Sequence, residues 1–140
     1  MGFWGFDVCK NMVSVPYPYH KKDAFTFIKF QMKQAKEEKP KNYTFFLELK
    51  SDKKVIGCLS VVKIDYFSGT GETGSWVNKK YWRQGYMTEA KIAVNNFAFN
   101  KLKLRRLFSP VFTDNVASNA TQKKMGYKLE GKMRECVVKM

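Results

Sequence analysis

The stretch from Gly74 to Gly131 constrains the fold of this chain more than any other part of its sequence. It reads as a strand, a glycine-containing turn, an amphipathic helix, a second strand, a short helix and a final strand. The turn at 81–90, YWRQGYMTEA, stands at the start of the helix. A helix start exposes unpaired backbone N–H groups and the positive end of the helix dipole, which together favour a phosphate. Gly85 lets the backbone approach such a ligand closely, because glycine has no Cβ.

The complete pattern of elements predicts a single mixed α/β domain. Apolar residues near the 3.6-residue period indicate helices, and runs of β-branched and aromatic residues between turn residues indicate strands. In chain order we expect a helix at 21–39, strands at 43–49 and 54–64, a loop at 65–71, a strand at 72–77, a helix at 87–100, a strand at 105–112, a helix at 116–125 and a strand at 127–138. Meander strands followed by alternating helices and strands are typical of a mixed sheet.

Four patterns follow one another along the chain: GETGSWV at 71–77, the turn at 81–90, NVAS at 115–118 and KMGYKLEG at 124–131. In this order and at this spacing they resemble the GNAT superfamily of N-acetyltransferases, and within it the ribosomal-protein alanine acetyltransferases. A weaker match, VPYPY at 15–19, extends the resemblance toward the N-terminus, so that it covers most of the chain. The resemblance implies a mixed, mostly antiparallel, twisted sheet with helices on both faces and a central pair of strands that splays apart.

Compared with the family pattern, the chain is short at both ends. As a single domain over 1–140 it would lack the usual first strand and helix and a last strand. A missing edge strand exposes unpaired backbone groups. Phe3, Trp4 and Phe6 could cover part of the gap, or a second copy of the chain could pair with the uncovered edge and form a homodimer. An incomplete domain is the remaining alternative.

The resemblance also implies acetyl-coenzyme A as the cofactor. Its diphosphate would lie on the turn, against Arg83, Gln84, Gly85, Tyr86, Met87 and Thr88. Met87 departs from the family, in which Gly or Ala often ends this loop. The alternative is an ordinary helix start with a turn glycine.

Pantetheine would lie in the splay like an added strand, paired with the backbone of Trp76 and Val77. Asn115 would support the pantetheine, and Lys124 would contact a phosphate. The alternatives are core packing for Trp76, helix capping for Asn115 and simple solvation for Lys124.

Two residues are candidates for the chemistry. Glu72 would lie near the thioester and accept a proton from the acceptor amine. An α-amine has a pKa of about 7.7–8.0, against about 10.4 for lysine, so it is the easier substrate near neutral pH. Ser118 would assist departure of the thiolate. Gln122 stands where many superfamily members have a tyrosine acid, which leaves the general acid open. A solvated carboxylate at Glu72 and a helix cap at Ser118 are the alternatives.

The acceptor cleft would be lined by Tyr17, Tyr19 and His20, although a packed aromatic loop explains these residues equally well. No metal site is predicted, because the three cysteines are odd in number and far apart in the sequence.

The charge of the chain is +14, from 26 basic and 12 acidic residues. Such a chain attracts polyanions such as coenzyme A or RNA and repels polycationic acceptors such as polyamines. A lysine-rich surface that only interacts with solvent is the alternative. No apolar run approaches the ~20 residues that span a bilayer, and no signal peptide is found. We therefore expect a cytoplasmic protein without a membrane partner.

The sequence therefore predicts an acetyl-CoA-dependent N-acetyltransferase that transfers an acetyl group directly to a primary amine. The resemblance favours the N-terminal α-amine of a protein or peptide. Two alternatives stay open: a catalytically weak acyl-CoA-binding remnant, and a basic protein that binds RNA or the ribosome.

Overall fold

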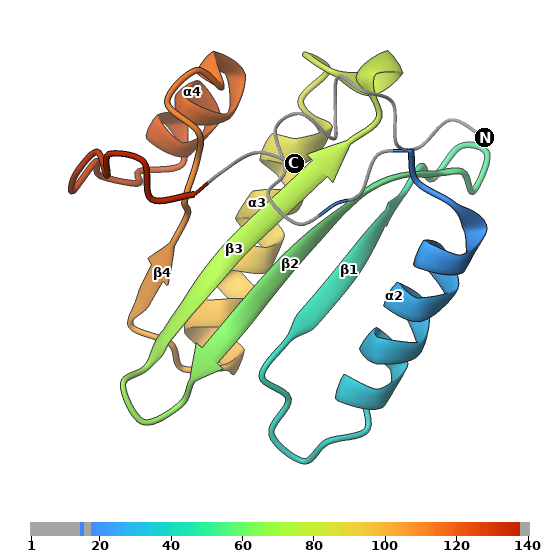
Figure 1. Cartoon of the computed structure of the whole chain (residues 1–140), viewed down its shortest axis with the longest axis horizontal. Coiled ribbons are helices and arrows are strands. Elements are labelled where there is room, and N and C mark those ends of the chain that lie inside the picture. The colour runs from blue at the N-terminus through green and yellow to red at the C-terminus, as the bar shows by residue number, and fades with distance from the viewer. Residues whose placement is uncertain (1–14, 16–17, 138–140) are drawn as a thin grey trace.

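A four-stranded sheet with the order β1-β2-β3-β4 forms the centre of the computed structural model, which describes residue 15 and residues 18–137 (Figure 1). Three strands form an antiparallel meander, and the fourth joins β3 in parallel. The strands are β1 (Tyr43–Glu48), β2 (Val55–Asp65), β3 (Thr70–Val77) and β4 (Arg106–Phe108). The mixed, mostly antiparallel sheet predicted from the sequence is confirmed.

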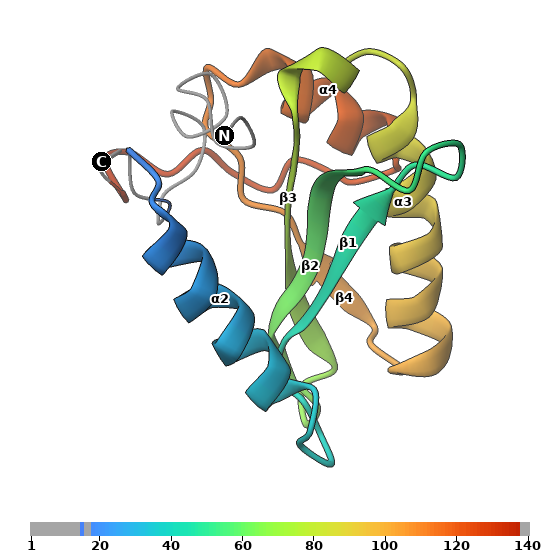
Figure 2. The same ribbon diagram turned by 90° about the vertical axis from the view of Figure 1, so that its right-hand side faces the viewer.

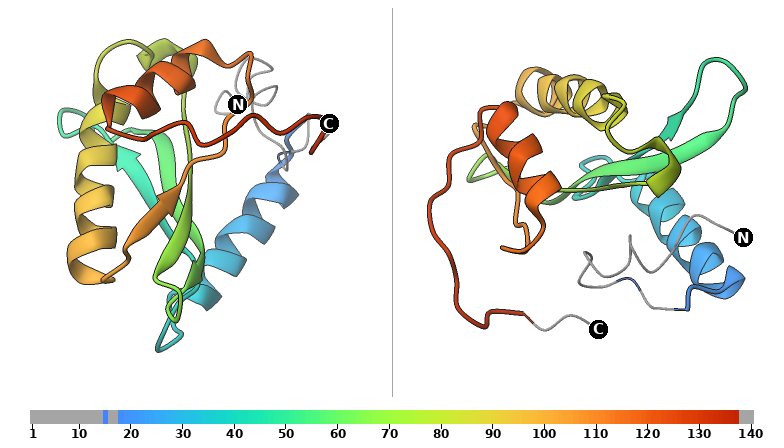
Figure 3. Two further views of the ribbon diagram at one scale, coloured as in Figure 1. Left: turned by 90° about the vertical axis from the view of Figure 1, so that its left-hand side faces the viewer. Right: turned by 90° about the horizontal axis from the view of Figure 1, so that it is seen from above.

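Helices cover both faces of the sheet, as predicted (Figures 2 and 3). One face carries α2 (Lys21–Gln34), and the other carries α3 (Tyr86–Asn96), with α4 (Val116–Lys124) beside α3. A 3₁₀ turn, η1 (Lys79–Tyr81), follows β3, and a π-helical turn, η2 (Phe97–Lys101), ends α3. None of the helices in the described part of the chain is long and apolar enough to cross a membrane.

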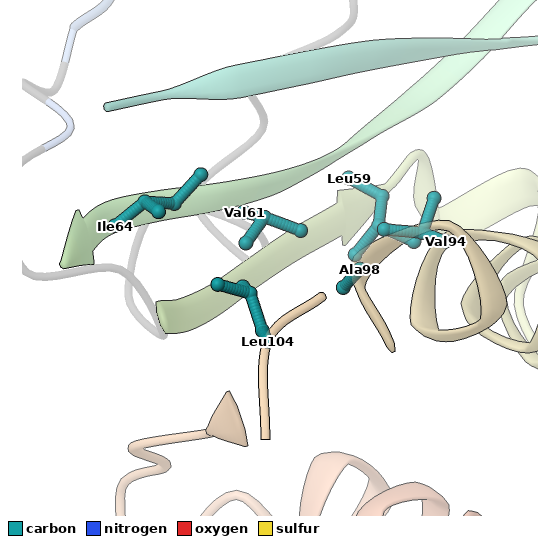
Figure 4. Close-up of a cluster of buried hydrophobic side chains, with 6 residues drawn as sticks. All are labelled: Leu59, Val61, Ile64, Val94, Ala98 and Leu104. Atoms are coloured by element: carbon teal, nitrogen blue, oxygen red, sulfur yellow. The ribbon is translucent and has the colours of Figure 1, made fainter. Parts of the chain in front are cut away.

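The hydrophobic core lies between the sheet and α3 (Figure 4). Its fully buried members are Leu59, Val61, Ile64, Val94, Ala98 and Leu104. Regular alternation would place Lys63 on the same face as Leu59 and Val61. Instead, the ladder is irregular between Val62 and Asp65, and Lys63 adopts a φ of 51°. This bulge shifts the alternation by one residue, so that Ile64 packs in the core.

Polar contacts hold α2 against the opposite face of the sheet. The Thr44 hydroxyl donates to Gln31 Oε1 at 2.9 Å and lies 2.9 Å from the Ser60 hydroxyl. No residue of α2 is buried, and its outward side chains Phe25 and Met32 are 64% and 58% exposed. No residue of α2 belongs to the buried core cluster, which lies on the α3 side of the sheet.

Several element boundaries differ from the prediction. The first helix ends at Gln34 rather than 39, where the apolar period gives way to a charged run. The loop predicted at 65–71 is shorter, because the Asp65 carboxylate accepts from the backbone N–H groups of Phe67 and Ser68 and closes a tight turn. β3 then begins at Thr70.

The final strand predicted at 127–138 is wrong over the residues that the structure describes, because 127–137 form no strand. Leu129 and Met133, which would face a core, are each 75% exposed. The β4 edge offers only a short ladder for pairing. After Glu130, whose carboxylate is held by both terminal nitrogens of Arg106, the segment runs away from the sheet (Figure 3).

Candidate cofactor and acyl-transfer site

The central strands β3 and β4 part after a short common ladder. They pair at Thr70–Arg106, Gly71–Leu107 and Glu72–Phe108. Beyond Phe108 the chain leaves the sheet, and no further pair of these two strands occurs in the described residues. Pro110 follows two residues after Phe108, and proline cannot donate to a ladder. The splayed pair is confirmed, and residues 73–77 of β3 extend past the point where β4 ends.

The turn that leads from β3 into α3 has an unusual backbone. Arg83 and Gly85 both adopt positive φ angles, 60° and 82°. Gly85 is the N-cap residue of α3, and a Cβ placed on it would meet no atom within 4 Å. The left-handed conformation therefore favours glycine here, and the space in front of it is open.

The first backbone N–H groups of α3 are available to a ligand. The first intrahelical bond runs from the Glu89 N–H to the Gly85 carbonyl at 3.0 Å. Within the described part of the chain, no group accepts a hydrogen bond from the N–H groups of residues 85–88. Together with the helix dipole, these donors make a site for an anion.

The side chains of the turn have different surroundings. Gln84 Nε2 donates to the Lys80 carbonyl at 3.0 Å, so this amide is engaged within the turn. The Tyr86 ring packs edge-on against Tyr81 with centroids 6.2 Å apart, and Met87 packs against the core cluster. Arg83 is exposed, whereas Thr88 is half-buried. Among the described residues, Arg83 and Thr88 are thus two polar side chains of this turn that make no hydrogen bond or ion pair.

The two strand residues expected to hold pantetheine already have structural contacts. The Val77 carbonyl accepts from the Trp82 indole N–H at 2.7 Å. Trp76 is half-buried beside Cys58. Burial raises the pKa of the Cys58 thiol, opposed by hydrogen bonds to Ser60 and Trp76, so this cysteine is a poor nucleophile.

The candidate base Glu72 lies on the α2 face of β3. Its neighbour Gly71 faces the core, where an added Cβ would come within 3.1 Å of Leu104 and Val61, so alternation turns Glu72 to the other side. The Glu72 side chain is 30% exposed, and its Oε2 lies 2.9 Å from Lys63 Nζ. Any ligand that reaches this oxygen must therefore share or replace the contact with Lys63.

The residues expected on α4 lie at its two ends. Asn115 is the N-cap, and its Oδ1 accepts from the Ser118 N–H at 3.2 Å. The capping interpretation of Asn115 thus holds, whatever else this residue does. Ser118 is half-buried in the first turn, and Lys124 is exposed in the last.

The three residues expected to line the acceptor cleft are only partly placed. Tyr17 lies outside the described residues, and Tyr19 is half-buried. His20 is exposed at the start of α2, where its N–H donates to Asp23 Oδ2 at 2.8 Å. His20 therefore has a capping role in the helix start.

A buried polar cluster between α3, α4 and β3 was missed from the sequence. Lys91, Gln122 and Thr73 are 2%, 8% and 4% exposed. Lys91 Nζ donates to Gln122 Oε1 at 3.5 Å, and the Tyr127 hydroxyl donates to Asn95 Oδ1 at 3.3 Å. Burial lowers the pKa of Lys91 to about 8. The available signal was the position of Lys91 beside the apolar stripe of the helix.

The parted strands, the open turn and the unpaired N–H groups at the helix start form an arrangement that suits an acyltransferase with a nucleotide-containing cofactor. The family profile described as acetyltransferase (GNAT) domain matches residues 6–128. The chain belongs to this family.

Individual relatives agree with this assignment. The chain is 33% identical over 89 residues to the uncharacterized N-acetyltransferase YoaA of Bacillus subtilis, covering 64% of this chain and 50% of YoaA. It is 29% identical over 90 residues to the ribosomal-protein-serine acetyltransferase of Escherichia coli, covering 64% and 50%. The chain thus spans about half the length of the curated relatives that it matches.

A solved structure shows the same architecture. The microcin C7 self-immunity acetyltransferase MccE, in complex with acetyl-CoA and AMP, superposes with a TM-score of 0.79 at 25% identity, over 94% of this chain and 71% of MccE.

Proposed function

We propose that this chain binds acetyl-coenzyme A and transfers the acetyl group directly to a primary amine. The observation that carries this proposal is the set of unengaged N–H groups at residues 85–88, placed just beyond the splay of β3 and β4. The diphosphate of the cofactor needs clustered hydrogen-bond donors, which the helix start provides. Its extended, amide-containing pantetheine arm needs a strand edge, which the free part of β3 provides.

The turn and β3 would hold the cofactor. The N–H groups of residues 85–88 bind the diphosphate, and Arg83 adds a charge-assisted contact. The backbone of residues 73–77, including Trp76 and Val77, runs alongside the pantetheine. Asn115 caps the start of α4, on the other side of the bound pantetheine from β3. Lys124 lies in the last turn of the same helix.

The bound cofactor supplies an acetyl group in thioester linkage, and the chain supplies proton transfer. Glu72 accepts the proton of the amine after the Lys63 ammonium yields its place. A cationic acceptor suits this exchange, because it replaces one cation by another. Ser118 assists departure of sulfur by donating a hydrogen bond.

We further propose that the acceptor is the α-amine of a protein or peptide in the cytoplasm. The relative from Escherichia coli is named as an acetyltransferase of a ribosomal-protein serine. The lower pKa of an α-amine, about 7.7–8.0, makes it easier for one carboxylate to deprotonate than lysine. The charge of +14 also disfavours a polyamine.

Calorimetric titration with acetyl-CoA followed by an amine panel tests this function. The panel contains a peptide with a free α-amine, the same peptide N-terminally blocked but with a lysine, and spermidine. We expect saturable binding of acetyl-CoA, and release of thiol with the free α-amine above both other acceptors. Absence of acetyl-CoA binding would contradict the cofactor assignment, and preference for spermidine would contradict the acceptor assignment.

A catalytically weak acyl-CoA-binding protein is the second candidate. The ion pair of Glu72 with Lys63 favours it, because the Lys63 ammonium occupies the place that an acceptor amine would need. This candidate predicts the same binding isotherm without thiol release from any amine.

A further inference from the structure

We propose that Lys91, buried between α3 and α4, is the general acid that protonates the departing sulfur of coenzyme A. This assignment rests on the proposed function and adds a residue to it. The sequence leaves the general acid open, because the amide of Gln122 cannot act as an acid. Gln122 is instead the hydrogen-bond partner of Lys91.

The burial of Lys91 is the first support for this role. Its side chain is 2% exposed, and it makes no ion pair with a described residue. The single hydrogen bond to Gln122 Oε1 is long, at 3.5 Å. A buried ammonium without a carboxylate costs stability, and such groups gather at functional sites.

The position of Lys91 on α3 is the second support. Thr88, Lys91 and Asn95 lie three and four residues apart and therefore share one flank of the helix. Asn95 accepts from the Tyr127 hydroxyl, which is also hydrogen-bonded to Thr73. Thr73 is the first residue of β3 beyond its last pair with β4. The flank that carries Lys91 therefore borders the splay, below the turn that would bind the diphosphate.

The third support is that base and acid would lie on opposite faces of the sheet. Glu72 projects to the α2 face, whereas Lys91 belongs to the helix on the other face. A thioester held at the end of the splay would meet the amine on one side and a proton donor for sulfur on the other.

The proton and electron balance of the step is simple. The amine nitrogen forms a bond to the acetyl carbon, and its proton passes to Glu72. The carbon–sulfur bond breaks with its electron pair on sulfur, and the Lys91 ammonium gives sulfur a proton. Lys91 then regains a proton from water.

The acidity of Lys91 matches this task. Burial lowers its pKa to about 8, close to the ~8.5 of an ordinary thiol, so the transfer is nearly balanced in energy. The group that contacts Lys91 from α4, Gln122, is uncharged. Burial raises the pKa of Tyr127, so its hydroxyl is neutral as well. Ser118 holds its proton far more tightly than a thiol and can only donate a hydrogen bond.

Three variants test the assignment in the full chain. Lys91→Met removes the proton, Lys91→Arg keeps a charge that does not dissociate, and exposed Lys101→Met is the control. We expect both Lys91 variants to bind acetyl-CoA like the wild type and to lose about 10²-fold or more in kcat. The wild-type kcat should fall as the pH rises above the Lys91 pKa of about 8, and this fall should be absent in Lys91→Met. Recovery of activity in Lys91→Arg would overturn the proposal, as would an unchanged pH profile in Lys91→Met.

A second readout needs no acceptor. Coenzyme A without its acetyl group is bound to each protein, and the ultraviolet absorbance of its thiolate is measured as a function of pH. The wild type and Lys101→Met should lower the pKa of the bound thiol relative to Lys91→Met. Equal values would overturn the assignment. If the values differ but no amine releases thiol, the acetyl-transfer proposal fails, whereas the position of Lys91 beside the bound sulfur is supported.

Discussion

Glu72 has a structural contact in the fold and a proposed chemical role as the general base. Its carboxylate closes an ion pair with Lys63, whose positive φ belongs to the bulge that fills the core with Ile64. Lys63 is 73% exposed, so the pair is weak and can open in solvent. The carboxylate can therefore act as the proposed base once an amine displaces the lysine.

Replacing Glu72 by Gln removes the base and keeps the shape of the side chain. We expect kcat to fall by about 10²-fold, the lower range for a general base, with binding of acetyl-CoA unchanged. Thiol release and calorimetry measure the two quantities. The control is Glu48→Gln on β1, which changes an exposed carboxylate of similar charge. Wild-type turnover at neutral pH in Glu72→Gln would remove this residue as the base.

Gly85 combines a left-handed backbone with an open space in front of it. Gly85→Ala should cost about 1 kcal/mol of stability, because a Cβ is unfavourable at positive φ. It should bind acetyl-CoA more weakly but measurably. Gly85→Glu adds bulk and a negative charge at the diphosphate and should abolish binding. Thermal unfolding separates strain from loss of the site, and retained affinity in Gly85→Glu would place the phosphates elsewhere.

Lys91 makes stability depend on pH in a direction that can be worked out. The pKa of lysine is about 10.4 in an unfolded chain. It is about 8 for Lys91 in the fold. The unfolded state therefore binds more protons between these values, and the free energy of unfolding rises with pH across that window. The wild type should gain up to about 3 kcal/mol relative to Lys91→Met from this group. Denaturation series at several pH values measure it, with Lys101→Met as control; parallel curves for wild type and Lys91→Met would contradict the depressed pKa.

At the scale of elements, the start of α4 depends on Asn115. Its Oδ1 accepts from the Ser118 N–H, which satisfies one of the unpaired donors of the helix. Asn115→Ala should lower stability by about 1 kcal/mol, whereas Asn115→Asp, which also caps, should not. Urea unfolding gives both values. If Asn115→Ala leaves stability unchanged but weakens acetyl-CoA binding, the side chain acts on the ligand rather than on the helix.

The elements with strong local signals were predictable from the sequence. Apolar periodicity located α3 and α4 to within a few residues, and the β1–β2 hairpin was found from its alternation around a polar turn. The turn before α3 was located from its glycine and its place before a helix, and its binding of a phosphate stays a prediction. These features depend on contacts between residues that are close in the sequence.

The elements that were missed depend on distant contacts. The segment at 127–137 alternates like a strand, but it lacks a partner edge of sufficient length. The π-turn at the end of α3 follows from the Phe97 ring, which packs edge-on against Tyr43 and Phe45 of β1. Lys91 was overlooked for the same reason, since its burial and its contact with Gln122 of α4 depend on packing between elements far apart in the sequence.

At the scale of the whole molecule, the charge of +14 should draw the cofactor to the site. The affinity for acetyl-CoA should fall by about tenfold or more as salt rises from about 0.05 to about 0.5 M, because screening shortens the reach of surface charges. Calorimetry at several salt concentrations measures this, with sucrose of equal osmolality as control. An affinity that does not change with salt would contradict this prediction and would mean that uncharged contacts dominate the binding of acetyl-CoA.

The outer edge of β1 carries no further strand in the described part of the chain. Phe46 of this strand is 51% exposed, and Phe25 on α2 is 64% exposed. This is the edge at which the homodimer expected from the sequence would form, and the dimer stays a prediction.

A crystal structure of the chain with acetyl-CoA tests the central claim most directly. We predict that the diphosphate oxygens lie about 3 Å from the N–H groups of residues 85–88. The pantetheine should run beside residues 73–77 of β3, with its sulfur near Lys91 Nζ. A diphosphate bound at any other surface, with these N–H groups facing only water, would contradict the account.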